Sequence, residues 1–140
     1  MSSSCIFCAI ASGEAPARIV HDDERTLAFM DLFPLTRGHA LVIPKAHCDS
    51  LLDADPEDAA AVMRTAQLVA QAAMRAYEPD GLNLLQTNGA AAMQTVFHLH
   101  VHVLPRYVGD GFHVEFQRHK GTDAELDEAA GLLRGALGTE

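Results

Sequence analysis

The sequence predicts an α+β fold, with an antiparallel sheet of about five strands, one long helix and a short C-terminal helix. Segments that are typical of strands lie at residues 17–22, 26–31, 39–44, 81–88 and 95–106. One long helix separates the third of these strands from the fourth. Parallel pairing needs crossover connections, and a single long helix supplies few of them. Antiparallel pairing is therefore favoured.

The first three strands are delimited by turn residues. The turn HDDER, residues 21–25, connects the first two strands, which are therefore predicted to form a hairpin. A loop that contains Pro34 and Gly38 separates this hairpin from the third strand. The third strand is apolar throughout and ends at Pro44.

The long helix is predicted from its N-terminal signals and its apolar periodicity. Asp55 suits the N-cap position, and Pro56 suits the first helical position. Glu57 and Asp58 complement the positive end of the helix dipole. Pro79 and Gly81 follow the helix. Its apolar residues recur at helical spacing and predict a buried stripe: Val62, Ala66, Val69, Ala73 and Tyr77.

The C-terminal region is expected to be a variable tail, residues 113–140, that contains a short helix. Thr122 and Glu125 match the capping-box pattern that begins a helix. The helix would carry three leucines, Leu126, Leu132 and Leu133. The sequence contains no repeat or linker, so we expect a single domain over residues 1–140.

Composition excludes several classes of function. The formal net charge is −9, which argues against binding to a nucleic acid polymer through a basic face. Backbone N–H groups can still bind one phosphate locally. Neither a membrane span nor a signal peptide is recognisable, so we expect no membrane partner and a cytoplasmic location. Three cysteines are too few for a disulfide scaffold, and a reducing compartment leaves thiolates available for a metal.

The segment VFHLHVHVLP, residues 96–105, places three histidines at every second position. In a strand, His98, His100 and His102 share one face, about 6–7 Å apart, with the outer two roughly 13 Å apart. Phe97 and Leu99 would then face the core, together with Val101 and Val103. The histidine face has three interpretations: a solvated polar face, a metal site, or acid–base and nucleophilic chemistry.

A candidate zinc site lies partly outside this strand. Cys5 and Cys8 form a C-x-x-C pattern, and His47 follows the third strand. With one of the strand histidines they would complete the four ligands of a closed zinc site. A redox-active C-x-x-C is the alternative, but such a pattern follows a strand and opens a helix, which we do not expect at this N-terminus. Cys48 is expected to be a small buried hydrophobe.

These residues resemble the histidine triad (HIT) family of nucleotidyl hydrolases and transferases, whose signature His-φ-His-φ-His-φ-φ is matched by HLHVHVL. The resemblance covers residues 5–112 and includes CIFCAI, FMDLFPLTRGHALVIPKAH and QTVFHLHVHVLPR in this order. Within this family, the sequence is similar to the zinc-containing bacterial branch that is related to the Hint proteins. The resemblance implies a two-layer α+β fold, a homodimer with sheets joined across the interface, and chemistry at the α-phosphate of a nucleotide.

The resemblance also implies roles for the histidines. His100, the middle histidine, would be the nucleophile that forms a nucleotidyl-histidine intermediate. His102 would contact the phosphate or help to protonate the leaving group. His98 would bind a structural zinc ion with Cys5, Cys8 and His47. His39 matches a histidine that supports the triad, although a hydrogen-bonded strand-edge histidine is an equally good interpretation.

Further positions correspond to nucleotide contacts. Asp31 would accept hydrogen bonds from the ribose hydroxyls, or would simply begin a turn. Apolar walls around the base would come from residues that are otherwise expected in the core: Phe7, Ile10, Phe29, Leu32 and Leu41. Polar groups around the phosphates would be Asn88, Gln94 and Thr95. Met93 departs from the family, whose members usually have Gly immediately before the Gln, and this change affects the expected geometry of the phosphate loop.

Three functions therefore remain in view. The first is a hydrolase of purine nucleoside phosphoramidates, acyl adenylates or dinucleoside polyphosphates, with AMP- or GMP-type substrates and His100 as nucleophile. The second is a catalytic zinc hydrolase that uses the strand histidines and a metal-bound water. The third is a non-catalytic nucleotide-binding protein of the same fold.

Overall fold

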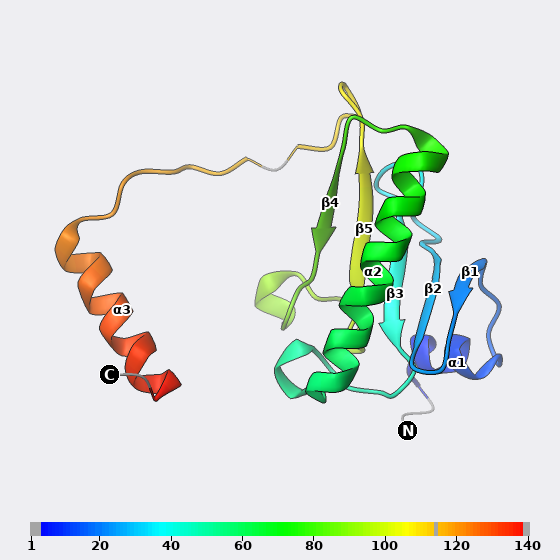
Figure 1. Cartoon of the computed structure of the whole chain (residues 1–140), viewed down its shortest axis with the longest axis horizontal. Coiled ribbons are helices and arrows are strands. Elements are labelled where there is room, and N and C mark those ends of the chain that lie inside the picture. Colours follow the sequence, from blue (N-terminus) through cyan, green and yellow to red (C-terminus); the bar gives the residue numbers. More distant parts are fainter. Residues whose placement is uncertain (1–3, 114, 139–140) are drawn as a thin grey trace.

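The computed structural model describes residues 4–113 and 115–138. Its centre is a five-stranded antiparallel sheet in the order β1-β2-β3-β5-β4, so β1 and β4 are the edges (Figure 1). The α+β prediction is confirmed. The strands are β1 (Ile19–Asp22), β2 (Thr26–Met30), β3 (Ala40–Pro44), β4 (Gly81–Leu85) and β5 (Val101–Arg106).

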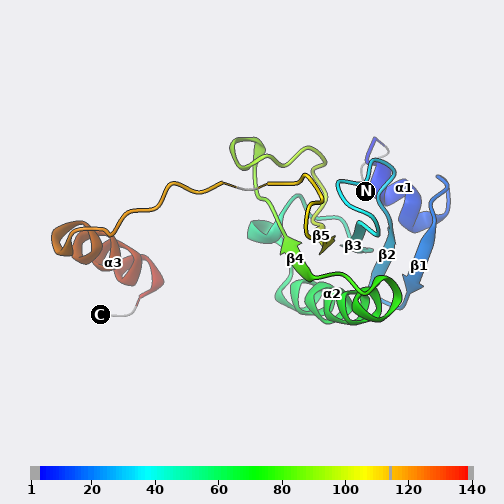
Figure 2. The same ribbon diagram turned by 90° about the horizontal axis from the view of Figure 1, so that it is seen from above.

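The long helix α2 (Pro56–Tyr77) covers one face of the sheet, and the short helix α1 (Ile6–Ser12) lies on the other (Figure 2). The Asp55 side chain accepts a hydrogen bond from the N–H of Glu57, and Pro56 begins the helix, as predicted. Between α2 and the sheet lies a core of small and β-branched side chains: Ala28, Ala40, Val42, Val62, Ala66, Val101 and Val103. No helix in the described part of the chain is long and apolar enough to cross a membrane.

A second core lies on the opposite face of the sheet and includes α1. It consists of Phe7, Ile10, Leu27, Phe29, Leu41 and Ile43. Strands β2 and β3 are therefore buried on both faces, which explains why their sequences are apolar without alternation. The cavity described below opens on this second face.

The histidine segment differs from its prediction. Regular pairing begins only at Val101, and residues 95–100 precede the strand as irregular chain. Leu99 donates its N–H to the carbonyl of Cys48 rather than to a neighbouring strand. The predicted core position of Phe97 is wrong, because its side chain is 47% exposed. The three histidines therefore do not lie in one regular row, and each can turn toward a different partner.

Helix α1 was not expected from the sequence. Cys5 is its N-cap and accepts a hydrogen bond from the N–H of Cys8, while Gly13 ends it in a left-handed conformation, φ +85°. The expectation that the C-x-x-C does not open a helix is therefore wrong. The cap uses a sulfur atom in place of the usual oxygen, so the ordinary N-cap signal is missing.

The C-terminal helix α3 (Asp123–Leu137) begins at the predicted capping box, in which the side chains of Thr122 and Glu125 each accept from the other's backbone N–H. Gly138 ends the helix in a left-handed conformation, φ +79°. Figures 1 and 2 show that α3 stands away from the sheet, beyond the β4 edge, at the end of an extended connection.

Candidate functional site

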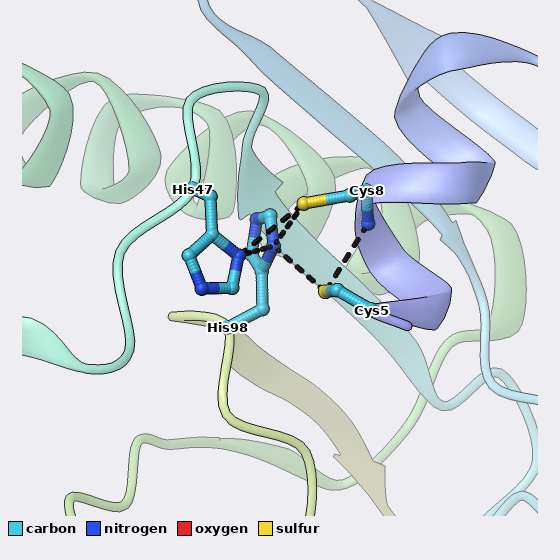
Figure 3. Close-up of side chains that lie close together, drawn as sticks. All are labelled: Cys5, Cys8, His47 and His98. Carbon is cyan, nitrogen blue, oxygen red and sulfur yellow. Dashed lines mark hydrogen bonds between the residues drawn. The ribbon is translucent and has the colours of Figure 1, made fainter. Parts of the chain in front are cut away.

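Four side chains from three separate segments converge beside α1 (Figure 3). Cys5 and Cys8 come from the start of the helix, His47 from the loop after β3, and His98 from the chain before β5. The Sγ of Cys8 lies 3.2 Å from Nδ1 of His47, and the Sγ of Cys5 lies 3.4 Å from Nδ1 of His98. All four donor atoms lie within 4.8 Å of one another. Two sulfurs and two imidazole nitrogens in this arrangement form a donor set that suits tetrahedral zinc.

The outer hydrogen bonds of the two histidines fit a metal. The Nε2–H of His98 donates to the carbonyl of Pro44 at 2.8 Å, which leaves Nδ1 as the nitrogen with the lone pair. The Nε2 of His47 lies 3.2 Å from a carboxylate oxygen of Asp49. A carbonyl and a carboxylate are the usual partners behind metal-bound imidazoles. Both rings therefore present Nδ1 to the sulfurs.

Burial keeps the Cys8 thiol of this cluster protonated unless a cation is bound. Burial, with a contribution from Cys5, raises the pKa of Cys8 to about 11. Burial also lowers the pKa of His98, so its ring stays neutral, as a ligand must. A dication that neutralises the thiolates would offset the cost of ionising Cys8. Cys48 is half-buried outside the cluster, and burial raises its pKa.

The next histidine along the chain, His100, lines the cavity on the second face of the sheet. The Nδ1–H of His100 donates to the carbonyl of His98 at 2.7 Å. The neutral ring then carries its lone pair on Nε2. Burial lowers the pKa of His100, which favours the neutral form. Phe7 packs edge-on against the ring, with centroids 5.2 Å apart, and holds its plane.

The third histidine is paired with His39. The backbone N–H of Leu35 donates to Nδ1 of His39 at 3.0 Å, so the proton of the neutral ring is on Nε2. This Nε2 lies 2.9 Å from Nδ1 of His102 and 3.4 Å from a carboxylate oxygen of Asp31. His39 therefore donates to His102, whose own proton is then on Nε2. Burial and the neighbouring histidines lower the pKa of His102 to about 4.

Asp31, His39 and His102 also lie close enough to one another to hold a cation. The position of the proton on the His39 ring, however, argues against a metal ion at this point. A metal at this point would need the lone pair of Nε2 on His39. The ring would then carry its proton on Nδ1, facing the N–H of Leu35. Two donors would oppose each other, whereas metal-bound histidines donate to an acceptor. The cluster is better suited to orienting His102.

The loop that carries Asp31 and His39 is fixed by close packing at its far end. Gly38 has φ +89°, and a Cβ at this position would overlap the ring of Tyr77. The guanidinium of Arg37 lies over the same ring, 5.3 Å from its centroid. The hydroxyl of Tyr107 donates to the Arg37 carbonyl at 2.9 Å. Helix α2 and the chain after β5 therefore hold this loop in place.

A cavity of about 960 Å³ brings the histidines together with most of the predicted nucleotide contacts. The predicted residues that line it are Phe7, Ile10, Phe29, Asp31, Leu32, His39, Leu41, Thr95, His100 and His102. Sequence reasoning missed other lining residues, among them Ile6, Pro16, Arg18, Phe33, Leu35 and Val96. Pro16 and Arg18 precede β1 and belong to no recognisable motif. Ile6 and Val96 are neighbours of predicted residues, and this proximity was the only available signal.

Two predicted phosphate contacts lie outside the lining of the cavity and stabilise its surroundings. The Gln94 side chain accepts from the N–H of Gly89 at 2.7 Å and donates to the carbonyls of Asp49 and Val96. Asn88 accepts from the N–H of Leu51 at 2.9 Å. Gln94 thus connects the loop before β5 to the segment that carries His47.

Met93 takes a backbone conformation that glycine adopts easily, with φ +75°. Its side chain is 75% exposed, and the residue does not line the cavity. The backbone therefore follows a path open to glycine, and the thioether points to solvent. Methionine in place of the expected glycine therefore strains the backbone but does not narrow the cavity.

The fold and the site define an α+β protein with a histidine-lined cavity beside a Cys2His2 cluster. Residues 12–109 match the HIT domain, and the chain belongs to this family. The HIT family is a superfamily of nucleotide-binding proteins and hydrolases.

Two relatives and two solved structures illustrate the similarity. The chain is 42% identical to Protein hit of Bacillus subtilis, over 84% of this chain and 82% of that one. It is 40% identical to adenylylsulfatase HINT3 of Arabidopsis thaliana, over 76% of this chain and 54% of that protein. A crystal structure from Streptococcus mutans has 36% identity and a TM-score of 0.94, and covers 98% of this chain and 87% of its own. A zinc-bound histidine triad protein of Mycobacterium smegmatis has 43% identity and a TM-score of 0.74, over 90% and 97%.

Proposed function

We propose that this protein is a nucleotidyl hydrolase that acts at the α-phosphate of purine nucleotides with a single phosphate, and that His100 is the nucleophile. The observation that carries the proposal is the hydrogen bond from Nδ1–H of His100 to the carbonyl of His98. It leaves the lone pair on Nε2 of a buried, neutral ring that lines the cavity. Neutral imidazole is the form that attacks phosphorus.

The proposed reaction has two displacements at phosphorus. The lone pair of His100 Nε2 forms an N–P bond to the α-phosphorus, and the bond from phosphorus to the leaving group breaks. An amine leaving group takes a proton from water, whereas a carboxylate leaves as the anion. Water then attacks the phosphorus, gives its proton to solvent, and the N–P electron pair returns to His100.

His102 acts on the phosphate as a hydrogen-bond donor. With Nδ1 facing the Nε2–H of His39, His102 offers Nε2–H to the phosphoryl oxygens. A pKa of about 4 means that the resting ring is neutral and is not a source of protons at neutral pH. Its contribution is to stabilise charge that develops on the phosphoryl oxygens.

The charges of the cavity favour one phosphate over a polyphosphate chain. Arg18 is the only Lys or Arg among the described residues that line the cavity. The chain carries a net charge of −9, which repels polyanions. Phosphoramidates and acyl adenylates carry a single phosphate and fit these charges, whereas dinucleoside polyphosphates fit them less well. The name of the Arabidopsis relative, an adenylylsulfatase, supports an adenylyl group as the part that is recognised.

The remaining roles follow from the lining of the cavity. Apolar side chains such as Phe29 and Leu41 would contact the base, and Asp31 would accept from the ribose hydroxyls. One Asp31 oxygen already accepts from the N–H of Phe33 at 2.8 Å, which orients the carboxylate. Thr95 would lie at the phosphate, and Asn88 and Gln94 would support the surrounding loops.

A structural zinc ion is part of the proposal. Cys5, Cys8, His47 and His98 would hold it, and the bound ion would connect α1 to the chain before β5. The zinc-bound relative from Mycobacterium smegmatis supports this metal. Thiolate ligands favour a reducing compartment, so we place the protein in the cytoplasm. Family resemblance supports a homodimer.

Adenosine 5′-phosphoramidate hydrolysis tests the function. We expect AMP release by the unaltered protein and at least a thousandfold slower release by His100→Ala, roughly the effect of losing a covalent nucleophile. Rapid quenching should trap a phosphorus–histidine adduct only when His100 is present. AMP binding without turnover of phosphoramidates, acyl adenylates or polyphosphates would instead indicate a non-catalytic nucleotide-binding protein. Full activity of His100→Ala with loss on chelation would indicate a catalytic zinc hydrolase.

A further inference from the structure

A second cavity, of about 550 Å³, adjoins the histidine-lined cavity. It lies between residues 34–37, in the loop that connects β2 to β3, and residues 107–110, in the turn that follows β5. Leu35 lines both cavities, so the two meet at this residue. None of the proposed nucleotide contacts is among the described residues that line the second cavity. A part of the substrate other than the nucleotide is therefore the natural candidate for it.

The second cavity lies farther along the direction of β5 than the three histidines do. His98 belongs to the Cys2His2 cluster, and His100 and His102 line the histidine-lined cavity. Tyr107 begins the turn that lines the second cavity, directly after Arg106 ends the strand. The order along this segment is therefore the cluster, the proposed nucleophile, His102 and the second cavity.

Leu35 connects the reacting end of the histidine-lined cavity to the second cavity. Its N–H donates to Nδ1 of His39, whose Nε2 lies 2.9 Å from Nδ1 of His102. The loop that carries Leu35 lies at the end of the sheet where β5 ends, because Ala40 pairs with Val103. A group attached to a phosphate at His102 can therefore extend past Leu35 into the second cavity.

In-line displacement at phosphorus sets the direction in which the leaving group departs. When His100 attacks, the bond that breaks points away from Nε2 of His100. His102 follows His100 along the chain and faces the phosphoryl oxygens in the proposed reaction. The direction away from His100 and past His102 leads to the second cavity. A leaving group larger than ammonia would therefore enter this cavity.

The second cavity presents apolar side chains. Pro34, Leu35 and Val108 are exposed, Leu35 to 53% and Val108 to 89%. The hydroxyl of Tyr107 donates to the carbonyl of Arg37 at 2.9 Å, so the polar end of this side chain is occupied and the two segments are held together. Exposed apolar side chains in a fixed concave surface favour an apolar occupant.

The charges beside these apolar side chains already have partners. The two carboxylate oxygens of Asp110 accept from Nε and Nη2 of Arg106 at 2.8 and 3.2 Å. The guanidinium of Arg37 lies over the ring of Tyr77 on α2. These are the charged side chains among the described residues that line the second cavity. A charged leaving group would therefore find no free counter-ion there.

We propose that the second cavity is a subsite for the leaving group, and that it selects phosphoramidates whose amine carries an apolar body, such as an alkyl or aromatic side chain. The inference rests on the proposed attack by His100 and adds the class of amine that is released. Leu35 and Val108 would contact the apolar body. Val108 lies outside the histidine-lined cavity, so it would affect the choice of amine without touching the nucleotide.

Two substrates test the subsite: adenosine 5′-phosphoramidate, which releases ammonia, and its N-(2-phenylethyl) derivative, which releases phenylethylamine. The measurement is the ratio of their kcat/KM values, phenylethyl over unsubstituted. Val108→Asn removes apolar surface, and Val108→Trp fills the second cavity. We expect each variant to lower the ratio roughly tenfold, the scale at which one methylene group in an apolar pocket discriminates between substrates. Hydrolysis of the unsubstituted compound should stay unchanged.

Leu52→Asn is the matched control, because Leu52 is 83% exposed and lines neither cavity. This variant should keep the ratio of the unaltered protein. An unchanged ratio in both Val108 variants, or an equal fall in the control, would overturn the subsite. Calorimetric binding of both compounds to His100→Ala protein repeats the comparison without turnover. Failure of the proposed reaction is therefore distinguishable from failure of the subsite.

Discussion

The Nε2 of His39 lies 2.9 Å from Nδ1 of His102, and the backbone N–H of Leu35 on the other side of the His39 ring fixes the direction of this hydrogen bond. A single amide proton therefore sets the tautomers of two imidazoles. His102 presents Nε2–H to the cavity as a result. This chain of hydrogen bonds gives His39 a positioning role.

Two substitutions of His39 should show whether this residue positions His102 through its hydrogen bond or only fills space beside it. His39→Ala removes the donor to His102, so both tautomers of His102 become available. We expect a fall in kcat of roughly 10–100-fold, the scale at which misplaced groups act. Nitrogen-15 shifts of His102 should move from the Nε2–H form toward a mixture. His39→Gln keeps an N–H donor and should restore part of the rate, and equal losses in both variants would contradict the positioning role.

Metal removal should lower the stability of the fold. A chelator should reduce the free energy of unfolding by about 3–4 kcal/mol when zinc was several hundredfold above its dissociation constant. Cys8→Ser should lose bound zinc and become insensitive to the chelator, as measured by metal analysis and urea unfolding. Cys48→Ser is the matched control and should keep both zinc and stability. If the purified protein contains no zinc and the chelator does not change its free energy of unfolding, the cluster is not a metal site.

Lowering the pH should destabilise the protein already at pH values above those at which carboxylates titrate. Burial lowers the pKa of His102 from 6.5 to about 4 in the folded state. Between these values the unfolded chain binds a proton that the folded chain does not, so stability rises with pH and falls as pH drops. His102→Asn should reduce this slope in urea unfolding measured from pH 7 to 4. An unchanged slope would mean that His102 titrates normally in the fold.

Met93 offers a substitution with an expected gain. A left-handed residue other than glycine costs about 1–2 kcal/mol, and the extra unfolded-state entropy of glycine offsets about 0.5–1 kcal/mol of the gain. Met93→Gly should therefore raise the free energy of unfolding by about 0.5–1 kcal/mol. Because the Met93 side chain does not line the cavity, kcat/KM should stay within about twofold. Gly89→Ala, at φ +92°, should have the opposite effect on stability.

The sequence predicted the elements whose signals are local. The caps of α2 and α3 lie at Asp55 and Thr122, as expected, because an N-cap is decided by a few neighbouring residues. Helix α1 was missed because a sulfur atom caps it. The strand predicted over 95–106 was too long, because alternation alone cannot show that Leu99 pairs with the loop at Cys48.

The candidate site was predictable to a similar degree. The motif identified the histidines, and the structure brings His98 to the cysteines and the other two to the cavity. The hydrogen bonds that set their tautomers come from the carbonyls of Pro44 and His98 and the amide of Leu35. Backbone groups carry no residue-specific signal, so no reading of side-chain types could have found them. Asn88 and Gln94 were placed at the phosphates from the motif, but their bonds to loops depend on the tertiary fold.

His98 connects two otherwise separate sites through one residue. Its ring faces the sulfurs of the Cys2His2 cluster, and its carbonyl accepts the hydrogen bond from Nδ1–H that orients His100. Oxidation of Cys5 or Cys8, or a lack of zinc, would free the His98 ring from the cluster. The His98 carbonyl would then hold the proposed nucleophile, His100, less firmly. In a cell, the proposed hydrolase would therefore slow under thiol stress without any change at the residues that touch its substrate.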